Sequence, residues 1–279
     1  MDITSVTSFR RARTRDDLVL APGETFMAGG TWLMSEPQPG TTGFVDLTSM
    51  AWPALEITAA GLRIGATCSI ADLVAWAQGR GGLAVPDGWA AASVIPDAAN
   101  ALLASFKVWN TATVGGNVCR AFAAGSMTAL VTTLDGVAEV WRADGSAYRV
   151  AVADLVTGNG KNALAPGDVL RAIDVPATAL RARTVLRKIA LAEHGRSGAV
   201  VSGRLDEDGS CVIVVTAATE RPTVFRFAGA PDAALLAGAI SGAAGYYADP
   251  LGAADWRRGV SVVLGERVRR DLFDREEAA

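Results

Sequence analysis

The stretch VWNTATVGGNV, residues 108–118, decides how the rest of the chain is interpreted. Two consecutive glycines follow the β-branched pair Thr113 and Val114 and precede Asn117, whose side chain can hold a turn by bonding nearby backbone. Glycine adopts positive φ without steric cost and has no Cβ to block a phosphate. The pair Gly115 and Gly116 therefore predicts a turn whose successive N–H groups form a nest for an anion.

A second glycine pair lies earlier, in AGGTWLM at residues 28–34. A short apolar strand over 25–28 is expected to break at Gly29 and Gly30, and a helical segment to begin there. A single Gly-Gly after a strand is most often an ordinary turn. Two such loops, both low in basic residues, favour a pyrophosphate held by backbone amides rather than by Lys or Arg.

Both loops resemble those of one family. AGGTWLM resembles the AGGT(D/H)LL loop, and VWNTATVGGNVC the VRN-x-ATLGGNLC loop, of the FAD-binding subunit of molybdenum hydroxylases. That family includes the medium subunit of carbon monoxide dehydrogenase and the flavin domain of xanthine dehydrogenase. The likeness continues through ALAPGDVL at 163–170, similar to TAL-x-PGE-x-L, to DWR at 255–257, so it covers most of the chain.

The resemblance implies an α+β fold in two domains. Residues 1–176 are expected to form a two-part FAD-binding domain of the PCMH type. Residues 177–279 are expected to form a smaller C-terminal domain of antiparallel strands and helices, similar to that of the carbon monoxide dehydrogenase flavoprotein.

The resemblance also implies that the two loops bind FAD, although a pair of structural turns is the alternative. The implied cofactor-binding residues are Ala28, Gly29, Gly30, Thr31, Trp32, Leu33, Thr113, Val114, Gly115, Gly116, Asn117, Ser126, Ile173 and Lys188. Lys188 lies where relatives often carry a lysine close to the flavin. A cation there would stabilise reduced, anionic flavin, and an exposed strand lysine is an equal alternative. His194 is given no role, and no catalytic residue or metal ligand is assigned.

Three departures from the family pattern stand out. Relatives often follow the second loop with ASPA-x-D, whereas this chain has RAFAAGS at 120–126, so Ser126 replaces a carboxylate with a shorter, uncharged hydroxyl. The connection over 35–43 is short. Trp109 stands where relatives usually have Arg, and we expect it either to pack inside or to face a partner.

Composition narrows the class of protein. The 279 residues are 50% hydrophobic, enough for a sizeable core, and the net charge of -3 with scattered basic residues excludes nucleic acid as a partner. The N-terminus lacks an apolar signal segment and no apolar run approaches the ~18 residues of a membrane span, so we expect no membrane span and a cytoplasmic protein. Three cysteines are too few for an iron–sulfur cluster held by four, and a single histidine predicts no metal site.

Periodicity and turn residues predict the following elements. Strands are expected at 25–28, 44–47, 55–58, 62–65, 137–141, 148–150, 169–175, 185–189, 199–205, 211–216 and 224–227. Helices are expected at 70–77, 127–134, 233–244 and 255–270, and a short helix should start at Asp16-Asp17 and end at Pro22-Gly23. Residues 83–106 should be mainly helical with interruptions at Pro86 and Pro96. The pattern changes beyond Pro176, which places the domain boundary at 176–181.

The resemblance finally implies a function, electron transfer through FAD. The chain would take electrons from a [2Fe-2S] subunit, which receives them from a molybdopterin-binding large subunit, and would pass them to oxygen, NAD or a quinone. Two alternatives stay open: a stand-alone flavin oxidase, and a flavin-free scaffold subunit of the same complex.

Overall fold

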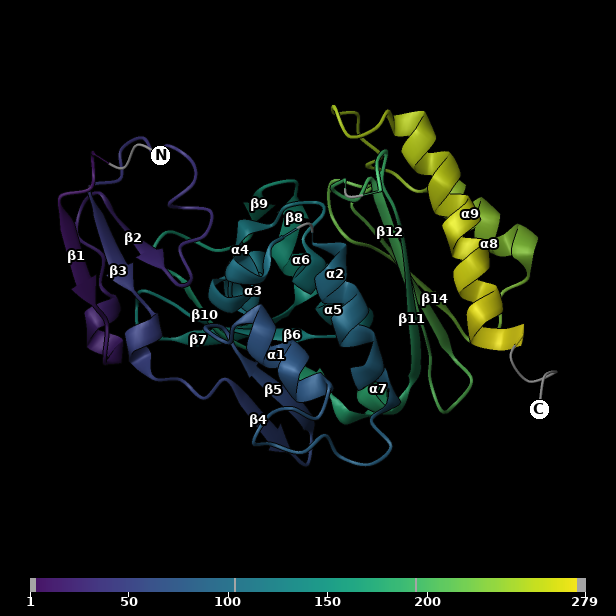
Figure 1. Cartoon of the computed structure of the whole chain (residues 1–279), viewed down its shortest axis with the longest axis horizontal. Coiled ribbons are helices and arrows are strands. Elements are labelled where there is room, and N and C mark those ends of the chain that lie inside the picture. Colours follow the sequence, from purple (N-terminus) through teal and green to yellow (C-terminus); the bar gives the residue numbers. More distant parts are fainter. Residues whose placement is uncertain (1–3, 103, 194, 275–279) are drawn as a thin grey trace.

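The computed structural model describes residues 4–102, 104–193 and 195–274 and shows an α+β protein. A small sheet lies at one end, a five-stranded sheet with helices fills the middle, and a four-stranded sheet backed by two helices closes the other end (Figure 1). The first glycine loop leaves the small sheet, and the second lies among the middle helices.

The small sheet is parallel. Its strands β1 (Ser8–Arg11) and β2 (Glu24–Met27) flank β3 (Gly43–Asp46). Strand β1 was not predicted, whereas the short helix near residue 16 is the 3-10 helix η1 (Arg15–Leu18). The helix expected after the first glycine pair is wrong, because residues 31–35 form turns in which the Met34 amide donates to the Gly30 carbonyl at 2.8 Å.

The middle sheet is antiparallel, in the order β4-β5-β10-β6-β7. Its strands are β4 (Leu55–Thr58), β5 (Gly61–Gly65), β6 (Val137–Trp141), β7 (Ala147–Ala151) and β10 (Val169–Pro176). The two predicted strand pairs, 55–65 and 137–150, are confirmed. The small pair β8 (Val156–Gly158) and β9 (Lys161–Asn162) was not predicted.

Helices cover one face of this sheet. They are the 3-10 helix η3 (Ala90–Val94) and the α-helices α1 (Ile70–Ala77), α2 (Ile95–Ala101), α3 (Phe106–Thr111), α4 (Val114–Arg120), α5 (Ser126–Thr133) and α6 (Val152–Leu155). The 3-10 helix η2 (Thr48–Met50) lies instead beside β1 of the small sheet. Pro96 lies in the first turn of α2, where its missing N–H costs nothing, so it starts this helix and does not interrupt one.

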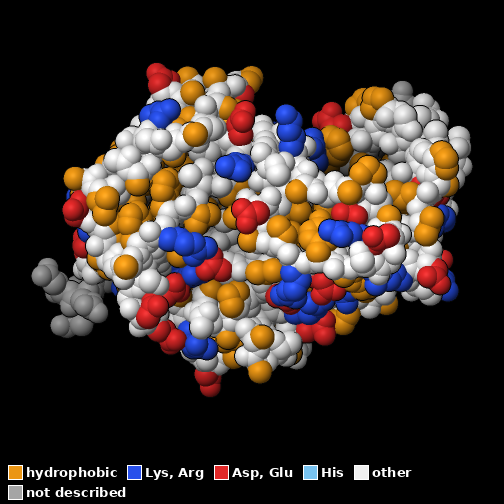
Figure 2. Space-filling model, turned by 180° about the vertical axis from the view of Figure 1, so that it is seen from behind, with side chains coloured by type: hydrophobic (Ala, Val, Ile, Leu, Met, Phe, Trp, Pro, Cys, Tyr) orange, Lys and Arg blue, Asp and Glu red, His pale blue; other side chains and the backbone are white. Residues whose placement is uncertain are grey.

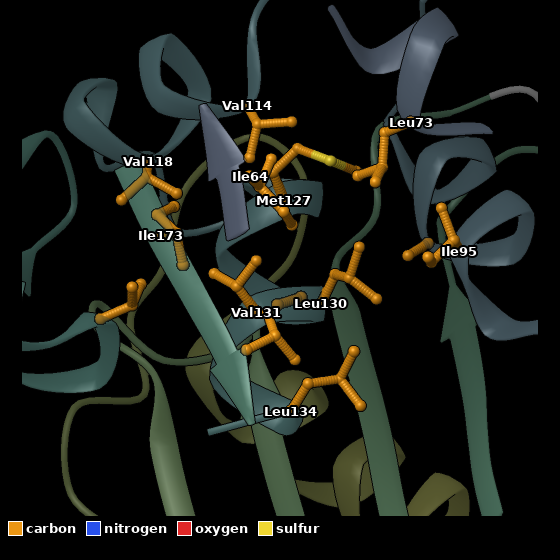
Figure 3. Close-up of a cluster of buried hydrophobic side chains, with 14 of the residues drawn as sticks. Ile64, Leu73, Ile95, Val114, Val118, Met127, Leu130, Val131, Leu134 and Ile173 are labelled. Atoms are coloured by element: carbon orange, nitrogen blue, oxygen red, sulfur yellow. The ribbon is translucent and has the colours of Figure 1, made fainter. Parts of the chain in front are cut away.

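Helix α5 is the centre of the main core, because every one of its residues is buried. Its Val131 side chain points toward Ile173 of β10, and its Met127 side chain lies beside Ile64 and Val114 (Figure 3). A helix that is buried on every side needs another layer on its far side.

That layer is the four-stranded antiparallel sheet, which follows the short helix α7 (Ala177–Arg181). It consists of β11 (Arg183–Ile189), β12 (Ala199–Leu205), β13 (Cys211–Thr216) and β14 (Thr223–Phe227), and helices α8 (Ala233–Gly242) and α9 (Ala254–Phe273) cover its outer face. The long buried runs of β12 and β13 reflect this cover on both faces.

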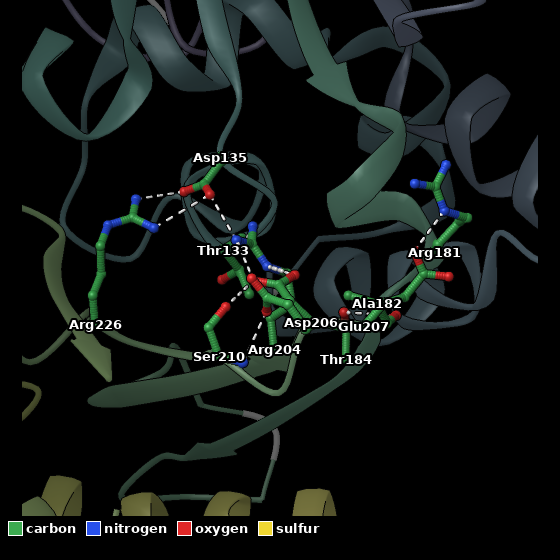
Figure 4. Close-up of polar contacts among 11 residues, drawn as sticks. Thr133, Asp135, Arg181, Ala182, Thr184, Arg204, Asp206, Glu207, Ser210 and Arg226 are labelled. Carbon is green, nitrogen blue, oxygen red and sulfur yellow. Dashed lines mark hydrogen bonds and ion pairs between the residues drawn. The ribbon is translucent and has the colours of Figure 1, made fainter. Parts of the chain in front are cut away.

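A buried ion-pair network fastens this sheet to α5 (Figure 4). Arg204 of β12 is 5% exposed; it donates to the Thr133 carbonyl at 2.9 Å and pairs with Asp135 at 2.6 Å. Asp135 also pairs with Arg226 of β14 at 2.6 Å. The two halves of the chain therefore share one interior.

Elsewhere the surface carries mixed charge. On the face seen in Figure 2, Lys and Arg side chains are interspersed with Asp and Glu. Among the helices of the described residues, none has the length and apolar character needed to cross a membrane.

Candidate functional site

A cavity of about 390 Å³ lies where the two glycine loops meet. Nine of the residues expected to bind the cofactor line it: Ala28, Gly29, Gly30, Thr31, Trp32, Leu33, Thr113, Gly116 and Asn117. The remaining walls come from residues that the sequence analysis did not select: Phe26, Leu102, Ala104, Val108, Ala112, Cys119, Arg120 and Phe122. Two segments more than 80 residues apart in sequence thus form one site.

The two loops touch backbone to backbone. A Cβ added to Gly29 would lie 1.8 Å from the carbonyl oxygen of Thr111, so only glycine permits this approach. Gly30 has a φ of +65°, in the left-handed region that favours glycine. The first pair therefore contains one glycine required by space and one required by conformation.

The first loop offers free backbone donors. In the described part of the chain, the amides of residues 29–33 donate no hydrogen bond, and the loop's own bonds begin with the Met34 amide. Consecutive amides without an internal acceptor, beside a cavity, fit an anionic group such as a diphosphate. That this loop holds a pyrophosphate stays a prediction.

The conformation expected of the second loop is wrong. Gly115 and Gly116 have no positive φ, because they form the first turn of α4. The first four amides of this helix already have acceptors: Val114 donates to Cys68 O, Gly115 to Ala66 O, Gly116 to the hydroxyl of Thr113, and Asn117 to Thr113 O. They are not bare donors for a phosphate.

Gly115 has a packing role instead. A Cβ at this position would lie 2.6 Å from both the Cβ and the carbonyl oxygen of Ala66. Asn117 accepts a hydrogen bond from the Met127 amide at 3.0 Å, which ties α4 to the start of α5. The glycine pair therefore seats α4 on the sheet, and its N-cap Thr113 and Gly116 form part of the cavity wall.

Five of the expected cofactor residues do not line the cavity. Val114 and Gly115 are buried behind its wall, and Ile173 lies in the main core beside Val118 (Figure 3). Ser126 is 2% exposed at the start of α5, and its hydroxyl has no partner in the described chain. Lys188 is exposed on β11, with its Nζ 2.7 Å from the Asn100 carbonyl. His194 lies outside the described residues.

Arg120 is the charged cavity residue that sequence reasoning missed. Of the described residues that line the cavity, it alone carries a charge. Its guanidinium Cζ lies 3.8 Å from the centre of the Trp32 ring and 3.9 Å from that of Phe122. The segment RAFAAGS at 120–126 contains the signal. It lacks the carboxylate that relatives have at 126, but it begins with the cation Arg120.

The other polar groups of the cavity are unsuited to acid–base chemistry. Burial raises the pKa of the Cys119 thiol to about 12, so it stays protonated at neutral pH. Within the described residues, no three His, Cys, Asp or Glu side chains gather as a metal site would require.

Trp109 is half-buried and packs against the main core.

Comparison with known proteins identifies the fold. The chain superposes on quinoline 2-oxidoreductase from Pseudomonas putida 86 with a TM-score of 0.78 at 19% identity, covering 95% of this chain and 96% of that one. Carbon monoxide dehydrogenase from Oligotropha carboxidovorans gives 0.78 at 21% identity, over 93% and 95%. Carbon monoxide dehydrogenase from Hydrogenophaga pseudoflava gives 0.80 at 18% identity, over 97% and 98%.

No curated protein sequence matches the chain closely enough to count as a relative. A family model does match, however, and it spans residues 8–178, which include the small sheet, both glycine loops and Arg120. Its description is the FAD binding domain in molybdopterin dehydrogenase. Since the match covers more than half of the sequence, the chain belongs to this family of FAD-binding oxidoreductase domains.

Proposed function

We propose that this chain is the FAD-binding electron-transfer subunit of a molybdopterin-dependent hydroxylase or dehydrogenase. It takes electrons from a [2Fe-2S] subunit, which receives them from a molybdopterin-binding large subunit, and passes them to oxygen, NAD or a quinone. The observation that carries the proposal is the cavity between the glycine loops, with the free amides of 29–33 on one wall and Arg120 on another. The family match to an FAD-binding domain supports it.

When bound, FAD supplies reversible one- and two-electron redox chemistry, and the protein's part is to bind and orient it. The amides of 29–33 suit the anionic diphosphate, and Gly30 and Gly116 keep backbone accessible at the cavity. The apolar residues Phe26, Leu102 and Val108 exclude water from the same space.

Substrate turnover belongs, in this proposal, to a partner chain. Among the described residues that line the cavity, there is no carboxylate or histidine to accept a substrate proton, and Cys119 is held as a thiol. The names of the structural relatives, quinoline 2-oxidoreductase and carbon monoxide dehydrogenase, support a place in such an oxidoreductase.

The first experiment is the absorbance spectrum of the purified chain between about 350 and 500 nm, before and after addition of FAD. We expect stoichiometric FAD uptake that Gly30→Val abolishes, because Gly30 adopts positive φ at the cavity. A wild-type chain that takes up no FAD would refute the cofactor site and favour the flavin-free scaffold.

The second experiment concerns partners. Affinity purification from the native host, with mass spectrometry and metal analysis, should recover iron and molybdenum with two further chains. Recovery of a flavin-bearing monomer that itself oxidises a small molecule would refute the subunit assignment and favour the stand-alone oxidase.

A further inference from the structure

Arg120 is clamped at the cavity wall by two aromatic rings. It is the last residue of α4, Trp32 comes from the first loop, and Phe122 follows α4. The two rings meet edge to face with centroids 6.4 Å apart. Stacking on aromatic faces fixes a guanidinium in one orientation and leaves its N–H edge free to donate.

Among the described residues no carboxylate contacts the guanidinium of Arg120, although Glu36 lies near it. In the described chain this side chain forms no ion pair and donates no hydrogen bond, and its Nε is buried without an acceptor. Burial lowers the pKa of Arg120, while the nearby Glu36 carboxylate raises it, and a guanidinium remains charged at neutral pH in either case. An anion that accepts hydrogen bonds from the guanidinium would stabilise this partly desolvated cation, whose buried Nε has no acceptor.

The matching anion is a diphosphate. The amides of residues 29–33 and the guanidinium of Arg120 border the same cavity, and Trp32 belongs to the loop while it contacts Arg120. Backbone amides and an arginine fork are the two kinds of donor that proteins combine on phosphate groups. The residue at 126, where relatives carry a carboxylate, is a buried serine outside the cavity.

We propose that Arg120 is the counter-charge for the diphosphate of the bound nucleotide, held in place by Trp32 and Phe122. The inference rests on the placement of FAD between the two loops proposed above. It makes the diphosphate, and not the flavin ring, the group that Arg120 recognises. A substitution of Arg120 should therefore weaken the binding of the nucleotide half of FAD even when the flavin is absent.

The test is isothermal titration of FAD, ADP and adenosine into the full chain and its Arg120→Gln variant. Glutamine keeps a planar amide at the stack and removes the charge. We expect FAD and ADP to bind about 10- to 100-fold more weakly, the loss typical of one or two charge-assisted hydrogen bonds, and adenosine to be unchanged. Arg120→Lys should retain part of the difference between ADP and adenosine.

The matched control is Arg142→Gln. Arg142 also stacks on an aromatic ring, with its Cζ 4.6 Å from the Tyr148 centroid, but it does not line this cavity. Its substitution should leave all three affinities unchanged. Thermal unfolding of each variant separates loss of binding from loss of fold.

Three results would overturn the inference. FAD binding by Arg120→Gln that equals or exceeds the wild type would show that Arg120 gives no attraction or obstructs the site. An equal loss for ADP and adenosine would reduce Arg120 to a packing role. If Arg120→Gln fails to fold, the test passes to Arg120→Lys. The inference would then be refuted if Arg120→Lys bound FAD with full affinity and bound ADP no more tightly than adenosine. In the first two cases, loss of FAD by Gly30→Val would leave the cofactor site itself standing.

Discussion

The contact between the two glycine loops predicts a large effect from the smallest possible change, Gly29→Ala. The added Cβ would lie 1.8 Å from the Thr111 carbonyl oxygen, and 2.7 Å from its carbon, so no side-chain rotation can relieve the clash. The loops must separate by about 1 Å or more to restore an ordinary contact. Overpacking costs about 1–3 kcal/mol, and a backbone obstacle places Gly29→Ala near the upper end.

The assay is thermal unfolding of the apo chain, followed by FAD titration. A loss of about 3 kcal/mol corresponds to a fall in Tm of roughly 6–12 °C for a chain of this size, and FAD should bind more weakly because the cavity widens. The control is Gly82→Ala, where an added Cβ meets nothing within 4 Å. Equal stability of the two variants would show that the loops are not in contact and would refute the geometry of the site.

Three further outcomes are expected. Arg204→Met should cost about 3–5 kcal/mol in urea unfolding at neutral pH, because it leaves Asp135 and Asp206 short of a buried partner. Burial raises the pKa of Asp135, but hydrogen bonds from Arg226 and Arg204 outweigh this effect, so the pKa is lowered overall. The stability that this carboxylate contributes is therefore complete above about pH 4 and is lost at lower pH. The difference in stability between Arg204→Met and the wild type should shrink as the pH falls below that value. Ser126→Ala should change the free energy of unfolding by less than about 1 kcal/mol, or raise it, since the buried hydroxyl has no partner in the described chain, and a larger loss would reveal one. Cys119 should react slowly with a thiol reagent at pH 8 until the chain is denatured, because desolvation raises its pKa to about 12; rapid labelling of the folded chain would contradict this raised pKa.

Most of the fold could be predicted because its strands have local signals. The strands at 137–141 and 148–150 flank an Asp-Gly turn whose Gly145 takes φ +87°, and the long apolar runs of β12 and β13 are buried on both faces. Strand β1 lacks such a signal, since its sequence SFRR is mostly exposed and polar. Only pairing with β3, more than 30 residues away, makes it a strand.

The site was harder to predict because a Gly-Gly pair indicates that side chains are not tolerated there, but it does not indicate whether space or backbone conformation is the reason. At 29–30 the pair serves one close approach and one left-handed residue, and at 115–116 it starts a helix packed on Ala66. The two places share the glycine pair but not its neighbours, AGGT at 28–31 and VGGN at 114–117, and tertiary contacts decide the outcome. The stack of Arg120 on Trp32 joins residues almost 90 positions apart, which no spacing within one motif reveals.

The C-terminal sheet supports the cavity from behind, although none of its residues lines it. The segment that carries Arg120 and Phe122 continues to Ala123, whose carbonyl accepts a hydrogen bond from the Ala217 amide at 2.7 Å, directly after β13. The Ala123 amide in turn donates to Asn159 Oδ1 at 3.1 Å. Because these bonds fix the segment on both sides, loosening the four-stranded sheet, as Arg204→Met does, should shift the guanidinium of Arg120 and weaken nucleotide binding without touching the cavity wall.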